Sequence, residues 1–144
     1  MLSVGIDIGG TKVAAGVVDE SGQIVRRIQR LTPSRSPEAV EDAIVESVRE
    51  LAHNLPICAV GIGAAGWIDT EQALVRFSPH LAWRNEPLRD RLSERITVPV
   101  LVDNDANAAA WAEFRFGAGQ GSRVMVCLTS VSYTHLTLPT ICSV

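Results

Sequence analysis

The sequence has little positive charge and no long apolar run. Lys12 is its only lysine, and Lys and Arg together number 13 against 16 Asp and Glu, for a formal net charge of -3. Nucleic-acid-binding proteins need clustered basic residues, so no nucleic-acid partner is expected. No apolar run approaches the roughly 18 residues of a membrane span, and the N-terminus lacks the charged-then-apolar order of a signal peptide. We therefore expect no membrane partner and, by default, a cytoplasmic location.

Cysteine is scarce as well. Cys58, Cys127 and Cys142 are odd in number and widely spaced, which argues against a disulfide framework or a zinc site. Two of them lie in apolar runs, so we expect reduced thiols in the core. His135 and Cys142 are too few for a metal site. With 144 residues, 47% of them hydrophobic, the chain has the composition of a single globular domain with a modest core.

The first apolar run, Leu2–Ile6, predicts a strand that leads into a concentration of polar and flexible residues. These are Asp7, Gly9, Gly10, Thr11 and Lys12. Glycines let backbone N–H groups approach phosphate oxygens, Thr11 adds a donor, Lys12 adds charge, and Asp7 can orient a hydrated Mg²⁺. Because Val13–Asp19 predicts a second strand, the turn joins two strands, unlike a Walker loop. An ordinary Gly-Gly hairpin is the alternative.

A third strand is predicted over 23–29, and a helix follows. Ser36 is the expected N-cap, and Pro37 occupies the first helical position. The apolar stripe of this helix is Val40, Ile44, Val48, Leu51 and Leu55, and Glu41, Glu46 and Glu50 lie off it. The helix therefore places one face on a sheet and ends before Pro56. The apolar run Ile57–Ile62 then predicts a buried parallel strand, with the helix as its crossover.

The segment Gly61–Gly66 matches the G-x-G-x-x-G pattern of dinucleotide-binding folds. That fingerprint requires a helix to begin at the glycines, whereas residues 67–72 predict an excursion that returns as the extended segment 73–77. We therefore reject a dinucleotide site. Glycines at the end of a strand still allow a ligand to approach the backbone closely.

A second polar concentration follows a later strand, predicted over 98–102. Asp103, Asn104 and Asp105 stand at its carboxyl end, followed by an alanine-rich helix over 106–116 and a glycine-rich linker. A helix cap is the plain interpretation of these three residues. If the parallel strands share one edge, however, Asp7, the Ala65-Gly66 turn and Asn104-Asp105 converge on one cleft. Asp105 could then accept a proton from an alcohol, and Asn104 could bind a neighbouring hydroxyl.

Two motifs carry a resemblance to a known family. Gly5–Lys12 and Asp103–Glu113 are similar to the phosphate and catalytic motifs of the ROK family of bacterial sugar kinases and repressors. Gly61–Gly66 and Phe77–Arg84 are similar to glucokinases of high-GC Gram-positive bacteria. The resemblance implies an α/β fold of the actin-like ATPase and ribonuclease H-like type, shared with hexokinase: a three-strand meander plus parallel strands with crossover helices, forming the first domain of a two-domain sugar kinase.

The resemblance also implies an activity and its residues. The activity is ATP-dependent phosphorylation of glucose at the 6-hydroxyl, with Mg²⁺, glucose and ATP as partners and a homo-oligomeric full-length protein. Asp105 corresponds to the general base, and Gly66 and Asn104 to sugar contacts. Asp7, Gly9, Gly10, Thr11 and Lys12 correspond to the nucleotide site. Many members have Asn where this chain has His80, so a sugar contact from His80 is not assigned.

The resemblance ends before the chain does. No glycine lies beyond Gly121, so the second phosphate turn, the zinc loop and the adenosine pocket are missing. We expect a domain over 1–118, a linker and first strand of a second domain over 119–129, and a non-native tail over 130–144. Such a fragment is expected to be inactive alone. The alternatives are a kinase for another hexose or N-acetylmannosamine, a ROK-type repressor, and a non-catalytic sugar-binding fragment.

Overall fold

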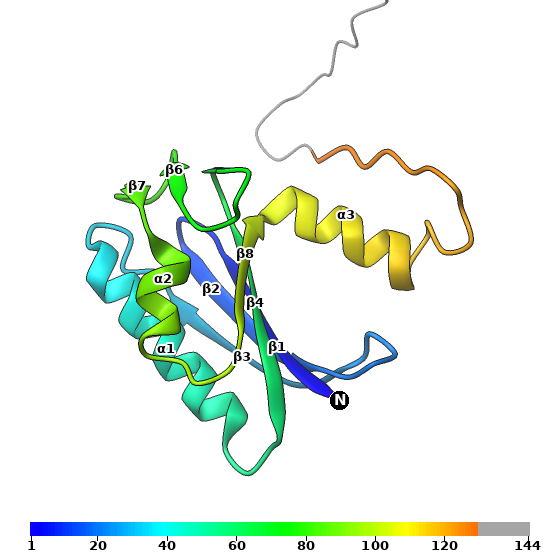
Figure 1. Ribbon diagram of the computed structural model, residues 1–144, viewed down its shortest axis with the longest axis horizontal. Coiled ribbons are helices and arrows are strands. Elements are labelled where there is room, and N and C mark those ends of the chain that lie inside the picture. Colours follow the sequence, from blue (N-terminus) through cyan, green and yellow to red (C-terminus); the bar gives the residue numbers. More distant parts are fainter. Residues whose placement is uncertain (130–144) are drawn as a thin grey trace, which may run out of the picture.

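The main sheet combines an antiparallel meander with parallel strands. A computed structural model of the chain describes residues 1–129 (Figure 1). The meander comprises β1 (Leu2–Ile8), β2 (Lys12–Val18) and β3 (Ile24–Leu31), and β4 (Ile57–Ala64) and β8 (Val100–Asn104) extend it in parallel with β1. The strand order is β3-β2-β1-β4-β8. The predicted α/β class, the meander and the parallel strand over 57–62 are therefore confirmed.

Helix α1 (Pro37–Ala52) begins as its sequence predicts. The Ser36 side chain accepts a hydrogen bond from the Ala39 N–H at 3.2 Å, which satisfies one of the free donors of the first turn. The helix packs on β1, β2 and β3 and contacts the short helix α2 (Leu88–Ser93), which packs on β8. Four of the five predicted stripe residues are buried, and Leu55 packs against the core from just beyond the helix.

The core lies between this helical layer and one face of the sheet. Alternate strand residues point into it because the side-chain period of a strand is two. They are Val4, Ile6 and Ile8 on β1, Val13, Ala15 and Val17 on β2, Val60, Ile62 and Ala64 on β4, and Val100 and Val102 on β8. The opposite face of the three parallel strands carries Gly5, Gly61 and Gly63. A Cβ at Gly5 or Gly61 would meet no atom within 4 Å, so this face is open there.

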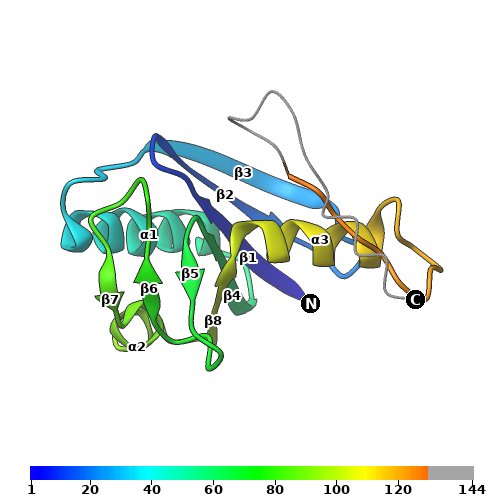
Figure 2. The same cartoon turned by 90° about the horizontal axis from the view of Figure 1, so that it is seen from above.

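Helix α3 (Asp105–Phe116) lies over that second face (Figures 1 and 2). A Cβ on Gly63 would stand 3.4 Å from Asp105 Cα, so the glycine makes room for the start of this helix. We expected the strand-end glycines to admit a ligand. At Gly63 the start of α3 takes part of this space, and Gly63 also lines a cavity beside the helix. No residue of α3 is buried, and Trp111 is 61% exposed.

A small second sheet follows the glycines of β4. Strands β5 (Trp67–Ile68), β6 (Val75–Phe77) and β7 (Arg84–Glu86) pair antiparallel in that order, and Figure 2 shows them side by side. No helix begins at Gly61–Gly66, which confirms the rejection of a dinucleotide fingerprint. The sequence predicted extended chain at β6, but it gave no indication of β7.

Two expectations about individual segments are wrong, and one residue off the apolar stripe of α1 is buried. Cys58 and Cys127 are free thiols but exposed. An irregularity in the pairing of β1 with β4 places Cys58 beside Ser3, on the face opposite the core, where the Ser3 Oγ lies 3.5 Å from the Cys58 Sγ. Glu41 is buried, because two arginines from the α2 segment reach it. The segment Val124–Leu128 forms no strand, since no other strand among residues 1–129 pairs with it, and Val124 is 82% exposed.

The predicted tail over 130–144 lies outside the described residues. Among residues 1–129 no helix has the length and apolar character that crossing a membrane requires.

A buried ionic cluster joins α1, β7 and α2. Arg91 contacts Glu41 at 3.2 Å and Glu86 at 3.1 Å, and both carboxylates are almost completely buried. The atom that Arg91 approaches on Glu86 is Oε1. This contact lacks hydrogen-bond geometry, so Oε1 has an ion pair but no hydrogen bond among the described residues. Burial raises the pKa of Glu86, and the positive charge of Arg91 offsets this effect only in part. Folding therefore favours the neutral form of this carboxyl group.

We expect Glu86→Gln to raise the free energy of unfolding near pH 7 and to leave it unchanged near pH 4. A raised folded-state pKa gives stability that is present below the ordinary value of 4.5 and is lost as pH rises through the folded value. The amide mimics the protonated form, so it avoids that loss. Urea unfolding of both chains at the two pH values measures the difference.

Glu38→Gln is the matched control with the opposite sign. Hydrogen bonds from its own backbone N–H and from Ser36 lower the pKa of Glu38, so its charge stabilises the fold above the ordinary pKa. This variant should be less stable than the parent near pH 7. A loss of stability in Glu86→Gln near pH 7 would show that pairing with Arg91 outweighs burial.

Candidate active site

Three parallel strands end at the same edge of the sheet. Ile8 at the end of β1 is in register with Ala64 on β4, and Ala64 is in register with Asn104 on β8. Asp7 stands one residue before this level, and Asp105 stands one residue after it, as the first residue of α3. The predicted convergence of Asp7, the Ala65-Gly66 turn and Asn104-Asp105 on one edge is therefore what the fold produces.

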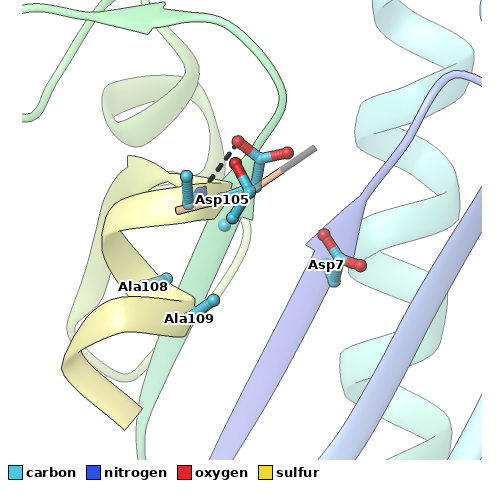
Figure 3. A pocket seen from close by; sticks show the side chains of 7 residues that line it. Asp7, Asp105, Ala108 and Ala109 are labelled. Carbon is cyan, nitrogen blue, oxygen red and sulfur yellow. Dashed lines mark hydrogen bonds between the residues drawn. The ribbon is translucent and has the colours of Figure 1, made fainter. Parts of the chain in front are cut away.

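Asp7 and Asp105 line a common cavity of about 440 Å³. Figure 3 shows the two carboxylates on opposite sides of it, Asp7 from β1 and Asp105 from the start of α3. The Ala106 N–H donates to Asp105 Oδ1 at 2.9 Å, which fixes one oxygen of that carboxylate. Ala108 and Ala109 form the α3 wall, where their small side chains leave the space between the acids open.

The electrostatics of this cavity favour a cation. The Asp7 side chain reaches solvent, but crowding by protein atoms raises its pKa, and the negative charge of Asp105 raises it further. No Lys or Arg forms an ion pair with either acid among residues 1–129. Carboxylate oxygens are the ligands that Mg²⁺ prefers, and it commonly binds through few carboxylates and several waters. The donor set thus fits a hydrated Mg²⁺, although no group of three or more ligating side chains occurs in the described part.

The glycine turn after β1 is a closed hairpin turn with free donors at its tip. The Gly9 N–H donates to the Lys12 carbonyl at 3.0 Å, and the Thr32 hydroxyl donates to the Gly9 carbonyl at 2.8 Å. The Gly10 and Thr11 N–H groups make no hydrogen bond within residues 1–129. The segment therefore has the geometry of a hairpin turn, as the alternative interpretation predicted. Two N–H groups at its tip are available to bind an anion. Lys12 is exposed, and neither Thr11 nor Lys12 lines the cavities described here.

Asn104 has two structural partners. Its Oδ1 accepts hydrogen bonds from the Ala106 and Asn107 N–H groups at 2.9 and 3.2 Å, so it caps α3. Its Nδ2 donates to the Gly66 carbonyl at 2.8 Å. The cap interpretation is thus correct, and Asn104 also lies at the cleft. Because its oxygen already accepts two hydrogen bonds and one N–H is used, Asn104 can bind the hydroxyl of a ligand only through its remaining N–H donor.

Gly66 adopts a backbone conformation that few other residues can reach. Its φ is 155°, and a Cβ there would collide with the Phe77 carbonyl oxygen. The neighbouring Ala65 donates its N–H to the Ile8 carbonyl at 3.3 Å and accepts from the Ser78 hydroxyl at 2.6 Å. These bonds hold the turn between the end of β1 and β6, so the Gly66 carbonyl reaches Asn104.

A second cavity, of about 500 Å³, adjoins the first at Asp105. Besides Asp105, its walls include four of the predicted site residues, Gly9, Gly10, Gly66 and Asn104. Trp67 and Phe77 also line this cavity, although neither was predicted as a site residue. His80, to which no role was assigned, lines it as well. His80 lies against Gly10, where an added Cβ would stand 2.6 Å from the His80 Cβ. The absence of a side chain at Gly10 is therefore a packing requirement as well as a possible aid to anion binding.

Curated relatives of this chain include bacterial glucokinases. The glucokinase of Streptomyces coelicolor is 49% identical over 128 residues, covering 89% of this chain and 40% of the relative. The glucokinase of Thermotoga maritima is 41% identical over 128 residues, covering 88% of this chain and 40% of the relative. The chain thus spans about 40% of the length of these curated relatives.

A solved structure shares the fold of this chain. The crystal structure of a ROK family glucokinase from Streptomyces griseus, in complex with glucose and AMPPNP, superposes with a TM-score of 0.81 at 52% identity. The match covers 84% of this chain and 38% of that one. The fold is therefore the actin-like ATPase fold of the ROK sugar kinases. A model described as the ROK family matches residues 3–132, which is most of the sequence. The chain belongs to the ROK family.

Proposed function

We propose that this chain is the N-terminal part of a glucokinase that transfers the γ-phosphoryl group of ATP to the 6-hydroxyl of glucose. The observation that carries the proposal is the pair Asp7 and Asp105 on opposite sides of one cavity, with the Gly66-Asn104 cavity opening beside it. One acid can serve a metal and phosphates while the other serves an alcohol. The likeness to glucokinases, one of them solved with glucose and AMPPNP, supports this assignment.

In this proposal Asp105 is the general base. Its Oδ1 is held by the Ala106 N–H, which leaves Oδ2 to accept the proton of the 6-hydroxyl as the oxygen attacks. Asn104 donates its remaining N–H to a second hydroxyl of the sugar. Its bond to the Gly66 carbonyl keeps the turn and the amide in one fixed arrangement. A general base of this kind contributes about 10²–10⁴-fold to the rate.

Asp7 and the glycine turn are proposed to hold the Mg·ATP. The free N–H groups of Gly10 and Thr11 point to phosphate binding at the tip of the turn, with Gly9 closing it. Lys12, exposed at the start of β2, contributes positive charge nearby. Asp7 would orient a hydrated Mg²⁺, and the metal would supply positive charge to neutralise the phosphate oxygens. We propose that the adenosine site, the rest of the nucleotide site and any structural zinc site lie in the second domain of the full-length protein.

The division of the chain is part of the same proposal. We assign residues 1–118 to the first domain and 119–129 to the connection with a second, on the grounds that α3 ends at Phe116 and irregular chain follows. A two-domain kinase closes around its substrates and excludes water, which otherwise competes as the acceptor. We further propose a homo-oligomeric full-length protein that acts in the cytoplasm on glucose.

The test is a coupled assay of ADP release by the full-length protein. Glucose, mannose, fructose and N-acetylmannosamine are offered in turn with Mg·ATP. We expect the highest kcat/KM with glucose. A higher value for another sugar would replace glucose with that sugar, and ADP release with none of them would remove the kinase assignment.

Asp7→Ala in the full-length protein is expected to raise the Mg²⁺ concentration needed for half-maximal activity by about tenfold, with the KM for glucose nearly unchanged. Asp7 is proposed to contact the hydrated metal and not the sugar. Titrations of Mg²⁺ at fixed ATP measure the effect. Asp90→Ala, which removes an exposed carboxylate from α2, is the control and should leave the Mg²⁺ requirement unchanged. An unchanged requirement in Asp7→Ala would reduce the motif to a hairpin turn.

A further inference from the structure

Two aromatic residues of the second cavity have no part in the mechanism described so far. Trp67 is 76% exposed and Phe77 is 39% exposed, and both line the cavity that contains Gly66, Asn104 and Asp105. An exposed large apolar side chain is common by itself. Two of them on one wall of a cavity that holds convergent polar groups have the composition of a ligand site.

This wall is held in a fixed position. Trp67 and Phe77 are partners across β5 and β6, and their rings meet edge to face with centroids 6.4 Å apart. The Arg84 guanidinium lies 4.2 Å from the Phe77 ring centroid. Arg84 Nη1 in turn donates to the Ser78 carbonyl at 2.9 Å and the Trp83 carbonyl at 2.6 Å. Arg84, Phe77 and Trp67 therefore form one stack. The Trp67 indole stands at its end and is 76% exposed to solvent.

The chemistry of the cavity is divided between its walls. The Asn104 amide and the Asp105 carboxylate supply polar groups, whereas Trp67 and Phe77 supply a flat apolar surface. A hexopyranose has the matching division, with hydroxyls around its rim and C–H groups on the faces of its ring. An aromatic ring packed on such a face removes apolar area from water on both partners.

Building on the proposed function, we propose that Trp67 is a specificity-determining residue of the sugar site, and that its indole packs against the C–H face of an aldohexopyranose while Asn104 and Asp105 bind its hydroxyls. Phe77 and Arg84 are positioning residues, because they act by holding the indole. Trp67 itself takes no part in proton or phosphoryl transfer. Its loss should therefore weaken sugar binding without slowing the chemical step.

The experiment uses the full-length protein and the variant Trp67→Ala. We expect the KM for glucose to rise about tenfold, with kcat and the KM for ATP nearly unchanged. Trp67→Phe keeps an aromatic surface and should recover most of the loss. Trp111→Ala is the matched control, because Trp111 is also exposed but lies on α3 outside this cavity, and it should leave the KM for glucose unchanged.

Tryptophan fluorescence supplies a readout that does not depend on turnover. Glucose added without ATP should shift the emission to shorter wavelength as the sugar displaces water from the indole. The shift should persist in Trp111→Phe and vanish in Trp67→Phe. Trp83 is completely buried and has no access to the ligand.

The outcomes separate this inference from the proposed function. An active glucokinase whose KM for glucose is unchanged by Trp67→Ala, and whose fluorescence response survives Trp67→Phe, would overturn the inference alone. A lowered melting temperature with an unchanged KM would likewise overturn it, because Trp67 would then be a packing residue. Failure of the parent protein to phosphorylate any hexose overturns the proposed function, whereas a glucose-dependent shift that requires Trp67 would still support the sugar contact.

Discussion

Asp105→Asn in the full-length protein is expected to lower kcat by about 10²-fold or more while the KM for glucose stays nearly unchanged. The amide has the size of the carboxylate and keeps an oxygen for the Ala106 N–H, so the start of α3 should not move. It cannot accept the proton of the 6-hydroxyl. A coupled assay of ADP release measures turnover, and a melting curve checks the fold.

Asp103→Asn is the matched control for this prediction. Asp103 lies two residues earlier, and its carboxylate accepts hydrogen bonds from Gln72, Asn104 and Asn107. Its role is therefore in the packing of the β8–α3 junction, and its loss should affect stability more than turnover. If Asp105→Asn retains near-normal turnover, Asp105 is not the base.

The second large effect is expected from Gly66→Ala. Alanine at a φ of 155° is strained, and its Cβ would collide with a backbone oxygen, which cannot rotate away as a side chain could. We expect a loss of about 2–4 kcal/mol in the free energy of unfolding. The Gly66 carbonyl also holds Asn104, so affinity for glucose should fall as well. Urea unfolding and glucose titrations measure the two effects.

Gly61→Ala provides the comparison within the same glycine-rich segment. Gly61 lies within β4, its φ is not positive, and a Cβ there meets nothing within 4 Å. This change should alter the unfolding free energy by no more than about 0.5 kcal/mol. Equal losses in the two variants would show that the glycines serve the strand in general and not the Gly66 turn.

Local chemistry explains which parts of the fold were predictable. The Ser36 cap and the start of α1 depend on neighbouring residues only, and the structure confirms both. The burial of Glu41 depends on Arg91, which stands on a different helix far along the chain. The exposure of Cys58 depends on an irregularity in the pairing of β1 with β4, which the sequence of β4 does not reveal. The strand expected near Val124 requires pairing partners that residues 1–129 do not contain.

The same division applies to the candidate site. Asp7 and Asp105 were predictable because carboxyl ends of parallel strands meet at one edge. The engagement of the Asn104 oxygen was not, since a cap and a ligand contact use the same residue type. Trp67 and Phe77 could be recognised only once the pairing of β5 with β6 placed them together beside Asp105.

The cleft between Asp7 and Asp105 is proposed to direct a phosphoryl group to the 6-hydroxyl of glucose. A ³¹P NMR time course of the full-length protein with glucose and Mg·ATP tests it most directly, because one spectrum resolves ATP, ADP, inorganic phosphate and sugar phosphates. We expect glucose 6-phosphate to accumulate in step with ADP, and both signals to grow about 10²-fold more slowly with Asp105→Asn. Accumulation of inorganic phosphate with ADP, or of a sugar phosphate at another position, would contradict this proposal.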